Sequence, residues 1–317
     1  MVRRFASFVR EKYSYIIISS LIAGIVVGFY TSYPGMLLRR FSVLFVVVMI
    51  ASMGFTITFR SFALALRDLK GFSVGMLLNF VIAPLICFAI ALAVPQREMV
   101  VGLILIGAVP CAGMAIVWAG LLDGNAPLAV VINTGTMIFA PFFIPLIMLL
   151  LVGSYVKINA LAMFLNLIYT ILIPVIVGML LREFAEKRVD VKKYLPLCPA
   201  ISAICAVFLM FIAVNTSVPV ILKNLNLLPP LLAATAVIFP ILFTFAYLLS
   251  SRLFDKAKNV AITYSCGMKN LPIALAIAIM SFGTLTALPV AVAFAFQMLT
   301  AVAFYRIYRV KGGGLCV

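Results

Sequence analysis

The sequence predicts an all-α polytopic membrane protein with ten transmembrane helices. Hydrophobic residues make up 66% of the 317 positions and charged residues only 10%, a balance foreign to soluble domains of this length. The apolar residues fall into ten runs close to the ~20 residues that a helix needs to cross a bilayer. The basic residues between these runs are concentrated on one side of the predicted membrane.

The ten runs follow one another with short polar connections and leave no room for a soluble appendage. No small-residue cleavage site follows the first apolar run, so we expect no cleavable signal and a single membrane domain over residues 1–317. The first run is the shortest. The expected spans are Tyr15–Tyr30, Met36–Phe59, Phe72–Val94, Val100–Trp118, Pro127–Val152, Ala160–Leu181, Pro196–Val214, Pro229–Ser250, Val260–Phe282 and Ala287–Tyr305.

The formal net charge of +16 invites a nucleic-acid interpretation, but the distribution of the charge argues against one. With the N-terminus inside, eighteen of the 24 Lys and Arg residues lie on inner segments and five on outer segments. This asymmetry is the positive-inside rule. It predicts a multi-pass protein of the plasma membrane with both termini in the cytoplasm, whose basic loops face anionic lipid.

The inventory of polar residues excludes several functions. All eight acidic residues lie outside the spans or at their ends, and the chain has no His. A cation site or proton relay of mid-membrane carboxylates, an aspartate-pair protease and a histidine zinc site are therefore not expected. The six Cys residues have neither metal-ligand nor disulfide spacing. We expect no enzyme activity, no metal and no cofactor.

The chain shows signs of an internal repeat. Residues 79–86 in span 3 resemble residues 235–242 in span 8, and span 4 then corresponds to span 9. The halves are residues 1–152, with spans 1–5, and residues 160–305, with spans 6–10. Because five is an odd number, the second half starts on the opposite side of the membrane. We therefore expect an inverted repeat, a common architecture of secondary transporters.

Spans 4 and 9 carry glycine and proline near their middle. Span 4 contains Pro110 and Gly113, and span 9 contains Gly267 and Pro272. These residues allow a helix to break, and broken membrane helices must line a cavity or be buried in protein. Their freed N-termini favour an anion. The alternative for each span is an ordinary proline kink.

Lys269 is the only charge deep inside a predicted span. A charge at this depth costs about 2.5–3.5 kcal/mol on insertion scales, so it indicates a functional site. Three interpretations remain open. The ammonium replaces a bound cation, it titrates and carries a coupling proton, or it extends to the membrane surface.

At these two spans the chain resembles the superfamily that joins bile acid:sodium symporters and arsenite-efflux permeases. The resemblance rests on the segment from Pro110 to Trp118 in span 4, on residues 133–141 in span 5, and on the segment from Ser265 to Asn270 in span 9. It implies a ten-helix inverted-repeat fold with a core and a panel domain, in which two broken helices cross at the substrate and ion sites. It also implies secondary transport by alternating access.

The chain departs from the symporter pattern at the sodium ligands. Ala115 and Ile116 stand where that branch has Ser-Asn, Ser265 replaces a glutamate, Lys269 replaces a glutamine, and Asn79 replaces a glutamine in span 3. By this resemblance both sodium sites are lost. We therefore expect no sodium coupling and consider proton coupling through Lys269.

The arsenite branch is matched in span 4, where Cys111, Met114 and Trp118 fit its cysteine-containing pattern. In that branch the cysteine is required for transport. Cys111 and Cys266 would lie near one crossing point and could bind As(III) as soft ligands. The alternative is that both are small residues that allow close packing. The glutamate of that branch in span 9 is absent.

The favoured function is transport of a small organic anion, because the expected cavity contains helix N-termini, one lysine and no carboxylate. Arsenite efflux is the first alternative, and a non-transporting membrane scaffold or sensor is the second. Gln297 is a weaker candidate for the site. The candidate substrate- and ion-binding residues are Lys269, Asn270, Ser265, Cys266, Cys111, Gly113, Met114, Asn133, Thr134, Thr136 and Asn79.

Overall fold

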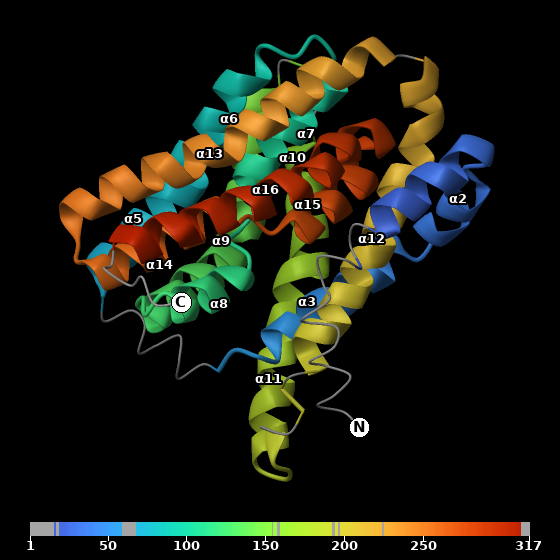
Figure 1. Ribbon diagram of the computed structural model, residues 1–317. Helices are drawn as coiled ribbons and strands as arrows, with labels where there is room; N and C mark the ends of the chain where they lie inside the picture. The colour runs from blue at the N-terminus through green and yellow to red at the C-terminus, as the bar shows by residue number, and fades with distance from the viewer. Residues whose placement is uncertain are drawn as a thin grey trace.

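The structure, a computed structural model, describes residues 16, 19–58, 68–153, 155–156, 159–191, 194–195, 197–223 and 225–311. This part of the chain folds into long helices that pack side by side (Figure 1). Its one β-type contact is an isolated antiparallel bridge between Cys111 and Lys269. The all-α prediction is confirmed for these residues. The predicted span ends at Tyr15, Phe59 and Pro196 lie outside them.

Within the described residues, six helical stretches are long and apolar enough to cross a membrane. A seventh span arises if the helix Ser19–Tyr30 and α2 (Tyr33–Arg39) are taken together, although the chain bends by 120° between them. These lengths support a multi-pass membrane protein. The six stretches are Leu69–Ala91 (α5 to α6), Ala126–Val152 (α9), Ala160–Glu186 (α10 to α11), Leu197–Lys223 (α12), Leu225–Leu253 (η4 and α13) and Leu285–Val310 within α16 (Thr284–Lys311).

The prediction of one helix over Met36–Phe59 is wrong. Residues 36–39 belong to α2, and α3 covers only Ser42–Gly54. The bend before α2 is held by Asn215 of α12, whose Oδ1 accepts the Gly35 N–H at 2.9 Å and whose Nδ2 donates to the Thr31 carbonyl at 3.0 Å. A side chain distant in sequence thus satisfies the backbone groups that the bend exposes.

Spans 4 and 9 are broken, as predicted. Span 4 consists of α7 (Arg97–Ala108) and α8 (Met114–Leu121), and span 9 of α14 (Lys256–Gly267), α15 (Leu271–Ile277) and η5 (Ala278–Phe282). The two breaks pair with each other. The Ala112 N–H donates to the Met268 carbonyl at 2.7 Å, and the Asn270 N–H donates to the Pro110 carbonyl at 2.8 Å. This pairing, called the crossover below, satisfies backbone that lipid could not.

Widened π-helical turns interrupt three spans: η1 (Leu78–Ile82) between α5 (Leu69–Leu77) and α6 (Ala83–Ala91), η2 (Ile168–Leu172) between α10 (Ala160–Leu167) and α11 (Ile173–Glu186), and η5. In η5 the Gly283 N–H donates to the Ala278 carbonyl, so the Ile279 carbonyl loses its usual helical donor. The Arg39 guanidinium donates to it instead, at 3.1 Å.

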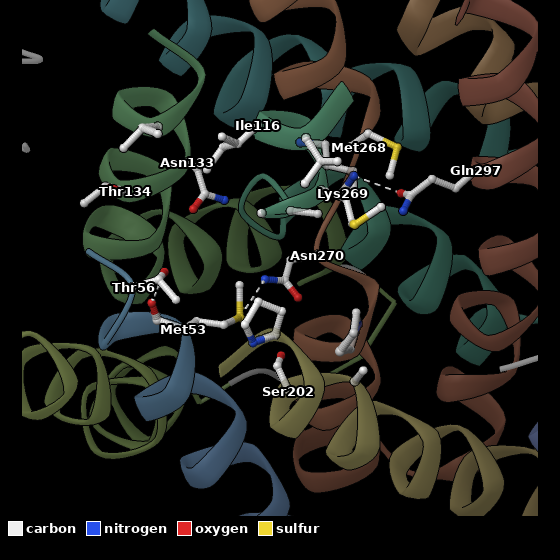
Figure 2. Close-up of a pocket in the computed structure, with 18 of the residues that line it drawn as sticks. Met53, Thr56, Ile116, Asn133, Thr134, Ser202, Met268, Lys269, Asn270 and Gln297 are labelled. Carbon is white, nitrogen blue, oxygen red and sulfur yellow. Dashed lines mark hydrogen bonds between the residues drawn. The ribbon is translucent and has the colours of Figure 1, made fainter. Parts of the chain in front are cut away.

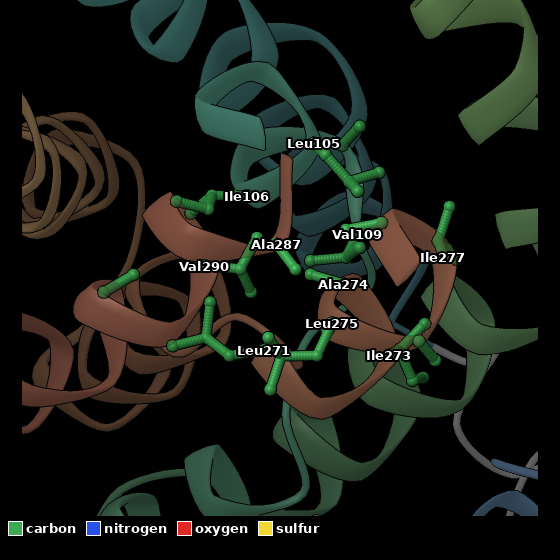
Figure 3. Packing of buried hydrophobic residues seen from close by; sticks show 14 of the residues in the cluster. Leu105, Ile106, Val109, Leu271, Ile273, Ala274, Leu275, Ile277, Ala287 and Val290 are labelled. Atoms are coloured by element: carbon green, nitrogen blue, oxygen red, sulfur yellow. The ribbon is translucent and has the colours of Figure 1, made fainter. Parts of the chain in front are cut away.

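The buried core surrounds α15. Leu271, Ala274 and Leu275 pack between α7, which contributes Ile106, and α16, which contributes Val290 (Figure 3). Each of these side chains is fully buried. Packing on both sides fixes where α15 begins and thus fixes the crossover residues before it.

Asp68 joins the start of span 3 to the start of span 9. Its carboxylate caps α5 by accepting the Gly71 N–H and lies 2.7 Å from the Lys258 ammonium. The hydrogen bond from Lys258 holds the pKa of Asp68 below its ordinary value of 3.8, and the same bond raises the pKa of Lys258 above 10.5. The ion pair therefore stabilises the fold between those two ordinary values. Its contribution is lost as the pH falls below 3.8 or rises above 10.5.

We expect Asp68→Asn, which retains a capping oxygen, to lower the melting temperature in detergent slightly at neutral pH. Exposed ion pairs are screened by solvent and contribute little, so the change should be small. The difference from the wild type should disappear as the pH falls below about 4. A difference that persists in acid would contradict the ion pair as its cause.

Candidate functional site

Side chains of α9 and α16 hold the crossover. On α9, Thr136 Oγ1 accepts the Cys111 N–H at 3.1 Å, and Asn133 Nδ2 donates to the Cys111 carbonyl at 2.8 Å. On α16, Gln297 Oε1 accepts the Lys269 N–H at 2.9 Å. Both bridging residues are therefore fixed by polar side chains from neighbouring spans. These hydrogen bonds fix the backbone conformation at both breaks.

The Lys269 side chain is fully buried, which excludes the interpretation that it extends to the membrane surface. Its Nζ donates to Asn79 Oδ1 at 2.9 Å, to the Asn79 carbonyl at 3.2 Å and to the Val109 carbonyl at 3.4 Å. An ammonium has three N–H donors, and three oxygen atoms face it. These three acceptors come from η1 and from the break in span 4.

Local backbone structure explains why these oxygens are free. In η1 the Ala83 N–H donates to the Leu78 carbonyl rather than to Asn79. The next residue is Pro84, which has no N–H, so the Asn79 carbonyl lacks a helical donor. The Asn79 Nδ2 donates to the Gly75 carbonyl at 2.9 Å, which directs Oδ1 towards Lys269. Val109 has extended backbone after α7, and its carbonyl likewise points out of the helix.

A cavity of about 350 Å³ borders the crossover (Figure 2). Its wall is largely apolar, and four methionines contribute to it: Met53, Met114, Met268 and Met298. Among the described lining residues none carries a carboxylate. The polar lining residues are Thr56, Asn133, Thr134, Ser202, Lys269, Asn270 and Gln297.

The structure brings some of the predicted site residues to this cavity and places others behind its wall. Gly113, Met114, Asn133, Thr134, Lys269 and Asn270 line the cavity. Thr136, Cys111, Cys266, Ser265 and Asn79 are buried outside the lining. Lys269 belongs to the cavity lining, but its ammonium is bonded to Asn79, a residue outside the lining. In this conformation the Lys269 ammonium is therefore bonded to protein oxygens.

The residues behind the wall have other partners. The Cys111 Sγ lies 3.4 Å from the Ala112 carbonyl, and the Cys266 Sγ lies 3.9 Å from the Leu78 carbonyl. No group of three metal-binding side chains occurs in the described part of the chain. Ser265 Oγ is buried and has no hydrogen-bond partner among the described residues. Ser265 stands where the resemblance places a glutamate.

Sequence reasoning did not find the walls that α3 and α12 contribute. Met53 lies in the last turn of α3, and Ile57 follows the end of that helix. The lining residues between Pro199 and Ala203 lie near the start of α12. These segments are apolar like the lipid-facing ones, so composition does not indicate that they face a cavity. Gln297 was a weaker candidate, and the structure makes it both a lining residue and a partner of the crossover.

Long apolar helices, two paired breaks and a cavity beside them define a polytopic helical membrane protein of the transporter type. Residues 43–224, more than half of the chain, match the model of the Sodium Bile acid symporter family. The chain belongs to this family, which confirms the resemblance stated from the sequence.

Individual relatives agree with this assignment. The chain is 26% identical over 271 residues to an uncharacterized sodium-dependent transporter, YocS, of Bacillus subtilis, covering 84% of this chain and 82% of that protein. It is 28% identical over 298 residues to the probable chloroplastic sodium/metabolite cotransporter BASS2 of Oryza sativa, covering 92% and 70%. A shorter match, 29% over 152 residues, joins it to the arsenical-resistance protein Acr3 of Alkaliphilus metalliredigens, covering 43% and 42%.

Proposed function

We propose that the protein is a secondary active transporter that moves a small organic anion by alternating access. Its ten spans would form two inverted repeats, residues 1–152 and 160–305, divided between a core and a panel domain. The observation that carries this proposal is the cavity at the crossover. Gly113, the N-cap of α8, and Met114, its first residue, line the cavity, so the positive end of a helix faces a space without described carboxylates.

Lys269 supports a transport cycle that does not require sodium at this position. Several relatives are named as sodium-dependent, and sodium is bound by oxygen ligands. Here the oxygens of Asn79 and Val109 hold an ammonium instead. A covalently attached cation would supply the charge that a bound ion supplies. Because the ammonium is fully buried, a coupling proton could leave it only in another conformation of the cycle.

The lining residues also indicate which side the cavity faces. Met53 and Ile57 lie next to the basic segment 60–70, and Pro199 lies next to the basic segment 182–193. The positive-inside rule places both segments in the cytoplasm, with both termini. The structure would then be an inward-facing conformation of a plasma-membrane protein.

Flux into proteoliposomes tests this proposal. Purified protein is reconstituted with imposed sodium gradients, pH gradients or neither, and labelled organic anions and arsenite are offered in turn. We expect organic-anion flux that is independent of sodium. A current driven by sodium would contradict the role assigned to Lys269. The absence of flux for every compound would favour a membrane scaffold or sensor.

Arsenite efflux is the second candidate, favoured by Cys111 and by the match to the arsenical-resistance protein. The Cys111 thiol is buried outside the cavity lining, so As(III) could reach it only after a rearrangement. We therefore expect Cys111→Ser to leave organic-anion flux at the wild-type level. If the wild type transports arsenite and Cys111→Ser does not, the second candidate is supported instead.

A further inference from the structure

Three side-chain amides border the cavity, and each has one end committed to the main chain. This commitment fixes which end remains for a ligand, because a main-chain N–H bonds only to the amide oxygen and a main-chain carbonyl only to the amide NH₂. We propose that the cavity selects an organic anion that also carries a hydrogen-bond donor, an O–H or N–H group, near its anionic group. This inference rests on the proposed function and specifies its substrate class.

Gln297 presents a donor. Its Oε1 is bonded to the Lys269 N–H at 2.9 Å, and no hydrogen bond to another described residue engages its NH₂ group. Gln297 is almost fully buried and lines the cavity, so the cavity is where this NH₂ finds a partner. A carboxylate oxygen in the cavity would supply that partner.

Asn270 also presents a donor. It is the N-cap of α15, and its Oδ1 accepts the Ile273 N–H at 3.4 Å. Its Nδ2 lies 3.9 Å from the Met53 Sδ, and a thioether is only a weak acceptor. Two amide NH₂ groups therefore offer donors at a cavity that the start of α8 also lines.

Asn133 is oriented the other way. Its Nδ2 is bonded to the Cys111 carbonyl at 2.8 Å, which leaves Oδ1 as an acceptor at the cavity. The neighbouring Thr134 Oγ1 is buried and has no partner among the described residues. Figure 2 shows Asn133 and Thr134 across the cavity from Gln297, with Asn270 between.

This arrangement rejects an anion that has no donor. Such a ligand would leave the Asn133 oxygen without water and without a bond, and an unpaired buried polar group is costly. Four methionines and other apolar residues form the remaining wall, which suits an apolar body. A short, branched hydroxy acid has the three required features.

Three matched probes test the substrate class: 2-hydroxy-3-methylbutanoate, 2-oxo-3-methylbutanoate and 3-methylbutanoate. They share the carboxylate and the branched body and differ in the donor. In competition for uptake by wild-type proteoliposomes, we expect the hydroxy acid to bind at least about tenfold more tightly than the other two. Equal affinity for all three would overturn this inference but leave the proposed function standing. Failure of every organic anion to be transported would overturn both.

Two isosteric variants test the residues. Gln297→Glu retains an oxygen for the Lys269 N–H, and Asn270→Asp retains the capping oxygen, while each loses its NH₂ donor. We expect both to raise KM for the hydroxy acid tenfold or more. Gln297→Met removes the NH₂ donor without adding a negative charge, and it should also raise KM.

Thr300→Val is the matched control on α16. Its hydroxyl donates to the Phe296 carbonyl at 2.8 Å, and Thr300 is not among the cavity-lining residues. This variant should transport with wild-type KM. A wild-type KM in Gln297→Glu and Asn270→Asp would overturn the assignment of the two donors.

Discussion

Replacing Lys269 with methionine is expected to reduce transport by roughly 100-fold. Methionine has a similar length but leaves Asn79 Oδ1, the Asn79 carbonyl and the Val109 carbonyl facing an apolar group. Each unsatisfied buried oxygen costs about 1–3 kcal/mol, and about 2.7 kcal/mol at the crossover is equivalent to that factor. The measurement is organic-anion flux in proteoliposomes at equal protein density, with size-exclusion chromatography to establish assembly.

Two further measurements separate the possible roles of this lysine. Lys269→Gln, which supplies an amide instead of the ammonium, should recover part of the flux and make it respond to sodium. A titrating Lys269 would make wild-type flux follow an imposed pH gradient, whereas a fixed cation would not. Wild-type, pH-independent flux in Lys269→Met would rule out both roles.

Adding a side chain at Gly54 or Gly178 is expected to cause a large loss of stability. The two glycines lie where α3 and α11 cross. A Cβ on Gly178 would collide with the Ala51 carbonyl oxygen, and a Cβ on Gly54 would collide with the Val175 carbonyl oxygen. Backbone atoms cannot move aside as a flexible side chain can. Overpacking costs about 1–3 kcal/mol, and small residues at helix crossings allow the close approach that membrane helices require.

Thermal unfolding in detergent checks this expectation. Gly178→Ala should lower the melting temperature by several degrees, and Gly178→Val should prevent assembly. Gly120→Ala is the control, because a Cβ at Gly120 meets nothing within 4 Å and alanine favours a helix. Equal melting temperatures for Gly178→Ala and Gly120→Ala would contradict the close crossing.

The breaks in spans 4 and 9 were predictable because glycine and proline act locally. Pro110 has no backbone donor and Gly267 permits non-helical dihedrals, so both mark positions where a helix can break. The conformation of the bend before α2 was not predictable in this way. It depends on Asn215, a residue far along the chain that bonds to Gly35 and Thr31.

The candidate site could be located from the sequence but not oriented. An isolated charge and a motif cysteine identify the crossover, yet neither reveals where a side chain points. The Lys269 ammonium turns to Asn79, and the Cys111 thiol lies behind the cavity wall. The contributions of Met53 and Ser202 had no sequence indication, because a cavity and the lipid select similar residues. Such orientations depend on packing between spans.

The widened turn before Pro84 shows how a membrane protein can stabilise a positive charge without an acidic residue. Because Pro84 has no N–H, the Asn79 carbonyl oxygen one turn earlier has no helical donor, and the Lys269 ammonium donates to it instead. Arg39 uses the oxygen that another widened turn vacates at Ile279. Surveys that look for buried cations by counting nearby carboxylates would overlook both. At Asn79 the sequence mark of this arrangement is Pro84, five positions later, whereas Ile279 is followed by no such proline.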